Sequence, residues 1–376
     1  MDAWGRSRGR GVTIRAAIIG TGQWAQRALV PALKAQPNVE LIACVGETQS
    51  LASVFAAAQH IPAAFGGIDD LLASPQRPDL LVVATPDDVH APATRAALTA
   101  GIAVYCEKPL ANDVTTAWEL AGLARLHKGI GTVGYSFRYS PAIQALRIDL
   151  MAGLLGEPWL IELYEHNPQF HPKYGKPMNW KGDPKRAAAG ALFEYGSHAV
   201  DLAGWLLGRT IAVSTNTATV VPGSHLDDIA TLQLRFESGA IGTLVCGWVL
   251  SGNFPGIRIR LHGSEGLGEV RLSEAIPGGE EYRRLPLDGG TGECVPIEPL
   301  VDTISAYARR HIADFAAVIA QGPIARAGTL PTLQDGALVQ DVLDAAIRGT
   351  AGWASVCVRE VQNRENDKRE EIHGCA

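Results

Sequence analysis

The sequence predicts an α/β protein: an N-terminal doubly wound parallel sheet, followed by a C-terminal α+β domain with an open, largely antiparallel sheet. Short apolar strands alternate with amphipathic helical segments in the first part, as in parallel sheets that helices cover on both faces. Strand-like runs separated by short turns follow in the second part. At 376 residues the chain exceeds a typical single core, so two domains are expected.

The composition indicates which kinds of partner the protein can bind and in which cellular compartment it is expected. Hydrophobic residues make up 47% of the chain and charged residues 19%, a balance typical of a globular protein. The net charge of −6, without a clustered Lys/Arg run, argues against a nucleic-acid surface. No apolar stretch reaches the roughly 18 residues that a membrane-spanning helix needs. The six cysteines lack metal-ligand spacing, which favours a reducing, cytoplasmic setting.

The first domain is expected at residues 13–136, after a flexible extension (1–12) without an apolar segment of the secretory type. Its strands are expected at residues 14–19, 41–45, 80–84, 103–106 and 132–134. Its helices are expected at residues 25–34, 51–59, 91–100 and 115–126, and Asn112 and Asp113 suit the cap of the last one. Ligands of such sheets bind beyond the carboxyl ends of the strands.

The second domain is expected at residues 137–358, and a charged, solvated tail at residues 359–376. A loop at residues 167–186, rich in Pro, Gly and Lys, is long enough to be functional. Strands are expected at residues 159–165, 211–221, 229–236, 240–249, 257–262 and 267–272. Helices are expected at residues 143–151, 190–207, 303–320 and 333–347, of which the last, capped by Thr332, can pack back on the first domain.

A Gly-x-Gly-x-x-Ala turn at residues 20–25 follows the first strand and opens the first helix. In a dinucleotide fold, Gly20 permits the tight turn, Gly22 lets the backbone approach the pyrophosphate, and Ala25 keeps the helix close to the sheet. The turn therefore predicts a bound dinucleotide. The candidate cofactor-binding residues, here and at the neighbouring strand ends, are Gly20, Thr21, Gly22, Gln23, Trp24, Ala25, Gly46, Glu47, Thr85, Pro86, His90, Glu107 and Lys108.

Further segments accompany this turn along the chain. Thr85-Pro86 and Cys-Glu-Lys-Pro (106–109) follow it in order, and Ala-Gly-Ala-Leu-Phe-Glu-Tyr-Gly-Ser-His-Ala-Val-Asp occupies residues 189–201. Pro-Thr-Leu-Gln-Asp-Gly begins at residue 331 and leads into the last expected helix. Together these segments resemble the glucose–fructose oxidoreductase / inositol dehydrogenase / MocA (Gfo/Idh/MocA) family of nicotinamide-dependent enzymes, over about residues 13–358. The first domain would then be that family's Rossmann domain.

The resemblance implies a reaction in which hydride moves between nicotinamide and a secondary alcohol or carbonyl carbon of a sugar, polyol, cyclitol or similar compound. It implies that His198 moves the hydroxyl proton, that Lys108 hydrogen-bonds the same oxygen, and that a cis bond precedes Pro109. Glu194 stands where the family often has Asp, so its role is open. Relatives line the nicotinamide and substrate pocket at the positions of Tyr135, Arg138, His166, Trp180 and Lys181.

From the residues alone, Glu194, His198 and Asp201 lie at i, i+4 and i+7 and so share one helical face. A carboxylate–imidazole–carboxylate line can orient and tune a general acid/base. The same spacing also fits a helix N-terminal acid beside a structural histidine. The candidate substrate-binding residues are Lys108, Tyr135, Arg138, Trp180, Glu194, His198 and Asp201, of which Lys108, Glu194 and His198 are the candidate catalytic residues.

The end of the second strand bears on the choice of cofactor. NAD-preferring relatives often have Asp at the position of Gly46, and here either Glu47 replaces its hydrogen bond to the ribose or Gly46 leaves room for a 2′-phosphate. We expect NAD, with NADP as the alternative, because Glu47 would repel a phosphate and no arginine follows Gly46. No metal is expected, since no cysteine or second histidine lies at ligand spacing.

Two other functions stay open beside the dehydrogenase. An NAD-dependent glycosidase would oxidise its substrate transiently, and a cofactor-binding sensor would not turn over. The pair Lys108 and His198 counts against the sensor, which has no need of proton transfer. Because an exposed apolar sheet face is a liability in a monomer, the open sheet predicts a homodimer or homotetramer.

Overall fold

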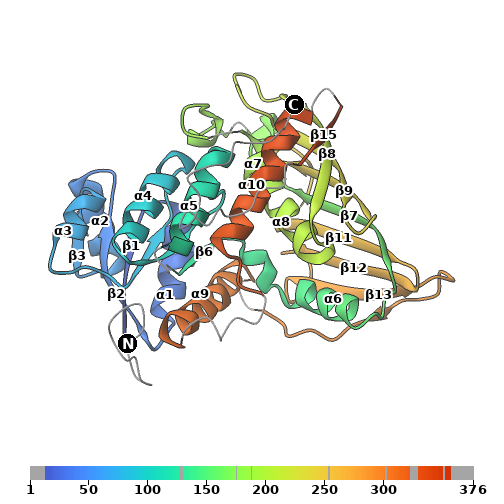
Figure 1. Cartoon of the computed structure of the whole chain (residues 1–376), viewed down its shortest axis with the longest axis horizontal. Coiled ribbons are helices and arrows are strands. Elements are labelled where there is room, and N and C mark those ends of the chain that lie inside the picture. The colour runs from blue at the N-terminus through green and yellow to red at the C-terminus, as the bar shows by residue number, and fades with distance from the viewer. Residues whose placement is uncertain are drawn as a thin grey trace, which may run out of the picture.

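Two sheets lie on either side of helix α10 (Leu333–Arg348) in the computed structural model (Figure 1). The structure describes residues 13–126, 130–174, 176–187, 189–252, 255–300, 303–321, 329–349 and 352–356. The predicted extension at residues 1–12 and the predicted tail at residues 359–376 lie outside these ranges. Within these ranges, none of the helices has the length and apolar character needed to cross a membrane.

The N-terminal sheet has six parallel strands in the order β3-β2-β1-β4-β5-β6. The strands are β1 (Ile14–Ile19), β2 (Val39–Val45), β3 (Ala63–Phe65), β4 (Leu80–Val83), β5 (Ala103–Cys106) and β6 (Gly131–Val133). All predicted strands are present, and β3 is an addition of three residues, too short to show a pattern. The chain reverses its order of strand addition between β1 and β4, which is where ligands bind in doubly wound sheets.

Helices cover both faces of this sheet. They are η1 (Ala25–Leu29), α1 (Val30–Lys34), α2 (Gln49–Gln59), α3 (Ile68–Ala73), α4 (Asp87–Thr99) and α5 (Val114–Leu126). Where one regular helix was predicted over residues 25–34, η1 is a π-helix that runs directly into α1. Pro31 lacks the N–H that would reach the Arg27 carbonyl in an α-helix, and the Ser305 hydroxyl donates to that carbonyl instead.

The C-terminal sheet has nine strands in the order β14-β13-β12-β11-β7-β10-β9-β8-β15. They are β7 (Pro158–His166), β8 (Thr210–Ala218), β9 (Ile229–Phe236), β10 (Ile241–Gly247), β11 (Pro255–Gly263), β12 (Gly266–Ser273), β13 (Glu280–Pro286), β14 (Glu293–Cys294) and β15 (Trp353–Ser355). The sheet is largely antiparallel as predicted, except that β7 and β10 pair in parallel. Helix α8 (Gly196–Leu207) packs on one face, against β7 and β10.

The other face of this sheet carries charged residues. Ion pairs run across its strands, with Arg258 Nη2 2.9 Å from Glu269 Oε2 and Arg260 Nη1 3.1 Å from Glu162 Oε2. Ile241 of β10 is half exposed. Cross-strand charge pairs therefore occupy part of this face of the sheet.

The predicted helix over residues 190–207 is divided. A single turn, α7 (Ala191–Glu194), ends at Tyr195, and α8 begins at Gly196. The other helices of this part are η2 (Ser136–Tyr139), α6 (Pro141–Met151), η3 (Pro172–Tyr174), η4 (Trp180–Gly182) and α9 (Thr303–Gln321). Glu194 and His198 therefore belong to two successive helices rather than to one.

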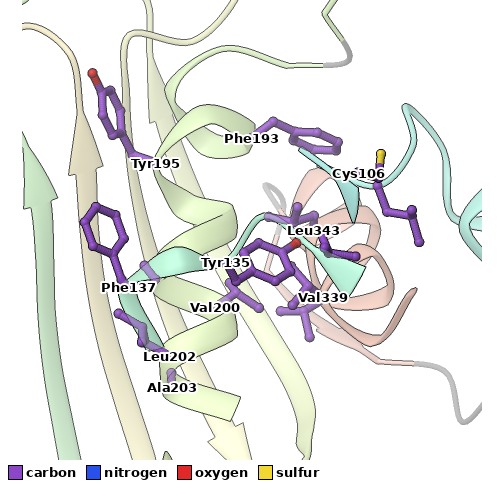
Figure 2. Close-up of a cluster of buried hydrophobic side chains, with 14 of the residues drawn as sticks. Cys106, Tyr135, Phe137, Phe193, Tyr195, Val200, Leu202, Ala203, Val339 and Leu343 are labelled. Carbon is purple, nitrogen blue, oxygen red and sulfur yellow. The ribbon is translucent and has the colours of Figure 1, made fainter. Parts of the chain in front are cut away.

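One hydrophobic core joins the two halves of the molecule. Val339 and Leu343 of α10 pack in a single cluster with Val200 of α8 and with Tyr135, as Figure 2 shows. On the opposite face of the N-terminal sheet, α9 packs against β1 and α1. Thr332 starts α10 with a reciprocal capping box to Asp335, which confirms the predicted cap.

Candidate functional site

The predicted dinucleotide turn lies at the carboxyl end of β1, beside that of β4. Gly20 has φ +107°, and a Cβ there would lie 2.1 Å from the Ala84 carbonyl oxygen. Gly22 is exposed, and a Cβ there would meet nothing within 4 Å. The turn is thus held tightly against β4 on one side and open on the other, so its residues fit a pyrophosphate.

The neighbouring strand ends also fit the cofactor. A Cβ at Gly46 would lie 2.8 Å from the Ala52 nitrogen of α2, so no side chain fits there, while Glu47 is exposed. The hydroxyl oxygen of Thr85 is buried and has no hydrogen-bond partner among the described residues. Such an unpaired buried hydroxyl is available to a ligand.

Several candidate cofactor residues make contacts within the protein that hold the loops of the site in place. Both ring nitrogens of the buried His90 lie near backbone oxygens, Nδ1 2.6 Å from Pro109 O and Nε2 3.0 Å from Thr85 O. The Trp24 indole donates to Glu107 Oε1 at 2.7 Å. Burial raises the pKa of Glu107. His90 and Glu107 thus fix the loops after β4 and β5, and the bond between Lys108 and Pro109 is cis, as predicted.

Lys108 and Glu194 meet although they come from different halves of the chain. Lys108 Nζ lies 3.0 Å from Glu194 Oε2 and donates to the Glu194 backbone oxygen at 2.9 Å. Lys181 Nζ approaches the other carboxylate oxygen, Oε1, at 2.5 Å. Glu194 therefore bridges two ammonium groups.

These contacts set the protonation states. Burial opposes the ionisation of Glu194, but the charges of Lys108 and Lys181 outweigh it and hold the pKa of Glu194 well below its usual range. Burial would lower the pKa of Lys108, but the carboxylates of Glu194 and Asp87 outweigh it and raise that pKa. The pair is therefore ionic at neutral pH.

A pocket adjoins this ion pair. It is lined by Asp87, Trp180, Lys181, Ala187, Ala189, Gly190, Glu194 and Trp248. Asp87 opens α4 of the N-terminal half, whereas Lys181 and Glu194 belong to the C-terminal half. The pocket thus lies where the two halves meet, and of the predicted substrate residues it holds Trp180 and Glu194.

His198 lies close enough to Lys108, Glu194 and Lys181 for their charges to affect its pKa. Its ring packs edge-on against Phe137, with 4.7 Å between ring centroids, and against Tyr135 at 5.9 Å. Burial, together with the charge of Lys108, holds the pKa of His198 well below its usual value. Its buried Nδ1 has no hydrogen-bond partner among the described residues. The ring is therefore neutral at pH 7. Among the described residues, the carboxylates of Glu194 and Asp201 pair with Lys108, Lys181 and Arg138 and make no hydrogen bond to His198.

Arg138 and Asp201 are engaged with each other. Arg138 Nε donates to Asp201 Oδ2 at 2.9 Å and Nη2 to Oδ1 at 2.5 Å, and both side chains are buried. Asp335 of α10 lies 3.6 Å from the same guanidinium. Burial outweighs Arg138 and raises the pKa of Asp201 to about 6. These two predicted substrate residues thus form an internal pair that joins η2, α8 and α10.

Two buried acids at the site are not among the candidate residues of the sequence. Asp87 is 6% exposed and lines the pocket, and it lies at the start of α4, four residues before the helix start expected from the sequence. Glu165 of β7 is 2% exposed, and burial raises its pKa well above the usual value. The alternation of polar and apolar residues in β7 could have indicated that Glu165 faces inward. In the described part of the chain, no cluster of three or more His, Cys, Asp or Glu is placed to hold a metal.

The loop before α7 is fixed by an acid distant in sequence. Asp227 accepts hydrogen bonds from Gly190 N at 2.8 Å and Leu192 N at 2.7 Å. Its backbone oxygen also accepts from Ala191 N at 2.8 Å. Asp227 thereby pairs the first N–H groups of α7, the turn that carries Glu194.

The turn, the switch point and the open glycine define the class of the N-terminal half as a dinucleotide-binding Rossmann domain. Residues 14–135 match the family model described as an oxidoreductase family with an NAD-binding Rossmann fold, and residues 143–268 match the GFO/IDH/MocA C-terminal domain. The chain therefore belongs to the GFO/IDH/MocA family, which confirms the resemblance drawn from its motifs.

Curated proteins of similar sequence are named as dehydrogenases. Inositol 2-dehydrogenase of Rhizobium meliloti (strain 1021) is 26% identical over 355 residues, which cover 90% of this chain and 98% of the relative. Levoglucosan dehydrogenase of Pseudarthrobacter phenanthrenivorans is 26% identical over 215 residues, 50% of this chain and 55% of the relative. The second match thus spans only about half of either protein.

Solved structures share the fold. Levoglucosan dehydrogenase in complex with NADH and levoglucosan gives a TM-score of 0.82 at 21% identity and covers 92% of this chain and 99% of that one. An oxidoreductase from Agrobacterium radiobacter in complex with NAD+, L-tartaric acid and magnesium gives 0.77 at 19% identity, with 92% and 99% covered.

Proposed function

We propose that this protein is an NAD-dependent dehydrogenase that interconverts a secondary alcohol and a carbonyl group of a sugar, polyol, cyclitol or similar compound. The observation that carries the proposal is the contact of Lys108 with Glu194 beside a pocket where the two halves of the molecule meet. The names of the relatives support the substrate class, since they act on inositol and levoglucosan. The exposed Glu47 supports NAD over NADP, because it would repel a 2′-phosphate.

In the proposed mechanism, bound NAD supplies the hydride acceptor, and the side chains manage the proton and the charge. Lys108 stays cationic because its pKa is raised, so its ammonium can stabilise the negative charge that develops on the substrate oxygen. His198 is neutral and can accept the hydroxyl proton. Glu194, which two lysines keep ionised, positions Lys108 instead of accepting a proton.

The test is a panel of sugars and cyclitols with NAD and NADP, followed by the absorbance of the reduced cofactor. On an oxidised substrate, Lys108→Met and His198→Ala should each lower kcat by about 10²–10⁴-fold, the usual range for lost acid–base and charge stabilisation. The Kd of NADH should stay within about twofold, because neither substitution alters the phosphate turn. Lys185→Met, which removes an exposed lysine from the segment that carries Lys181, is the matched control for Lys108→Met.

Activity within a few-fold of the parent in either variant would contradict these assignments. Turnover without accumulation of reduced cofactor would favour the glycosidase, and NADH binding without turnover of any compound would favour the sensor.

We also propose a homodimer or homotetramer that associates through the C-terminal sheet and resides in the cytoplasm. Light scattering coupled to size-exclusion chromatography tests the association.

A further inference from the structure

Asp87 is a buried carboxyl group at the pocket that the proposed mechanism does not use. It is 6% exposed and lines the pocket together with Lys181 and Glu194. Within the described part of the chain, no hydrogen bond or ion pair engages its carboxylate. Its neighbour Asp88 is exposed, with Oδ1 3.7 Å from Arg186 Nε.

Stabilisation of the helix does not account for this arrangement. An acid in the first turn interacts favourably with the helix dipole, and an exposed side chain suffices for that. Asp88 supplies such a charge one residue further along α4. A largely buried carboxylate that accepts no hydrogen bond is unfavourable, and a group in the pocket that donates one would stabilise it.

The surrounding charges indicate the chemistry of that group. Lys108 and Lys181 both act on Asp87, and they would repel a substrate ammonium group placed beside it. Asp87 and Glu194 would in turn repel an anion. A hydroxyl group carries no charge and can donate a hydrogen bond to a carboxylate, so it fits this mixture of charges.

We propose that Asp87 is a substrate-binding residue, whose carboxylate accepts a hydrogen bond from a substrate hydroxyl other than the one that is oxidised. The proposal rests on the proposed function, since it takes the pocket to hold the compound on which Lys108 and His198 act. Asp87 reaches the pocket from the N-terminal half and Glu194 from the C-terminal half. The substrate is thereby held from both sides.

The protonation of Asp87 makes the proposal sensitive to pH. Burial, reinforced by Glu194, raises the pKa of Asp87 to about 7, while Lys108 and Lys181 act in the opposite direction. The other titratable groups that interact with it are Asp88 and Cys106. A raised pKa means that the carboxylate is ionised above about pH 7 and protonated below it, so substrate affinity should fall as the solution is acidified through that value.

The experiment measures the substrate Kd by calorimetry in the presence of NADH, where the alcohol cannot be oxidised. Its ligand is the best substrate of the sugar and cyclitol panel. Asp87→Asn and Asp87→Ala should raise the Kd about tenfold or more, as expected for the loss of a hydrogen bond to a charged group, and should flatten its dependence on pH. Asp88→Asn, which removes the same charge from the same helical turn, should change the Kd by less than about twofold.

Each other outcome has a definite meaning. An unchanged Kd in both Asp87 variants, or a lowered melting temperature with an unchanged Kd, overturns the inference. If Lys108→Met still abolishes turnover in that case, the proposed function stands alone. A parent protein that oxidises no compound of the panel overturns the proposed function and the inference together.

Discussion

Two glycines of one turn are under different constraints. A Cβ at Gly22 would meet nothing within 4 Å, so Gly22→Val should fold with the parent's melting temperature but bind NADH at least tenfold more weakly, because the side chain occupies the space of the pyrophosphate. A Cβ at Gly20 would lie 2.1 Å from the Ala84 oxygen at φ +107°, so Gly20→Ala should lower the melting temperature.

Thermal unfolding and a fluorescence titration with NADH distinguish the two variants. If Gly22→Val binds NADH as tightly as the parent, the turn does not hold the pyrophosphate. If Gly20→Ala melts with the parent, the close approach of β1 to β4 is not a constraint on folding.

For single residues, the sequence predicts site residues that belong to recognisable motifs. It does not predict contacts that arise only when distant elements pack together. Lys108 and Glu194 stand in recognisable segments, and the structure places them 3.0 Å apart. Arg138 and Asp201 stand in similar segments, but their pairing with each other depends on a contact between η2 and α8 that local pattern does not encode. Asp87 is not among the candidate residues, because its burial depends on contacts that local sequence pattern does not encode.

Among the elements, the short helix α7 depends on Asp227. Asp227→Ala would leave the N–H groups of Gly190 and Leu192 unpaired, which should cost about 1–3 kcal/mol in the free energy of unfolding. Since α7 carries Glu194, kcat should also fall, by about tenfold or more, with little change in the Kd of NADH.

Thr332→Ala is the control for that variant. It removes the cap of α10, and the expected loss is about 0.5–2 kcal/mol of stability with unchanged kcat. Urea unfolding and steady-state kinetics give both quantities. Equal effects of the two variants on kcat would show that α7 has no special part in positioning Glu194.

Most helices and strands follow from local pattern, and the exceptions have physical causes. Strand β13 begins Glu-Glu-Tyr-Arg-Arg, and its charges hide the alternation that burial of Glu280 and Tyr282 reveals. The break between α7 and α8 falls where Tyr195 and Gly196 continue an apparent helical period. The parallel pairing of β7 with β10 is not visible in either strand alone, because the relative direction of two strands depends on how the chain between them is folded.

For the whole molecule, His311 links α9 to the N-terminal sheet. Its Nε2 lies 2.8 Å from the Thr132 hydroxyl and its ring stacks on Tyr139, fully buried. Burial, helped by the charge of Arg138, lowers the pKa of His311 to about 3. The unfolded chain therefore binds the proton more readily, and stability should fall as the pH drops below about 6.5.

The expected contribution is about 2 kcal/mol between pH 7 and pH 5, from about 1.4 kcal/mol per pH unit below the unfolded pKa. His311→Gln should be less stable than the parent at pH 7 but should lose about that much less on acidification. Urea midpoints at the two pH values measure this difference. His90 and His198, whose pKa values are also lowered, remain in both proteins and cancel in the comparison. Identical acid sensitivity of the two proteins would contradict the assignment.

Both halves of the chain contribute residues to the pocket, so the two halves cannot be exchanged independently of each other. Exchanging its C-terminal half with that of a relative would replace Lys181, Glu194 and Trp248 but keep Asp87. It would also replace α10, which packs against both α5 and α8. Recombination at the boundary between the halves therefore separates residues that line one cavity. A chimaera that takes its C-terminal half from a relative, to bind a new substrate, should therefore take the start of α4 from the same relative.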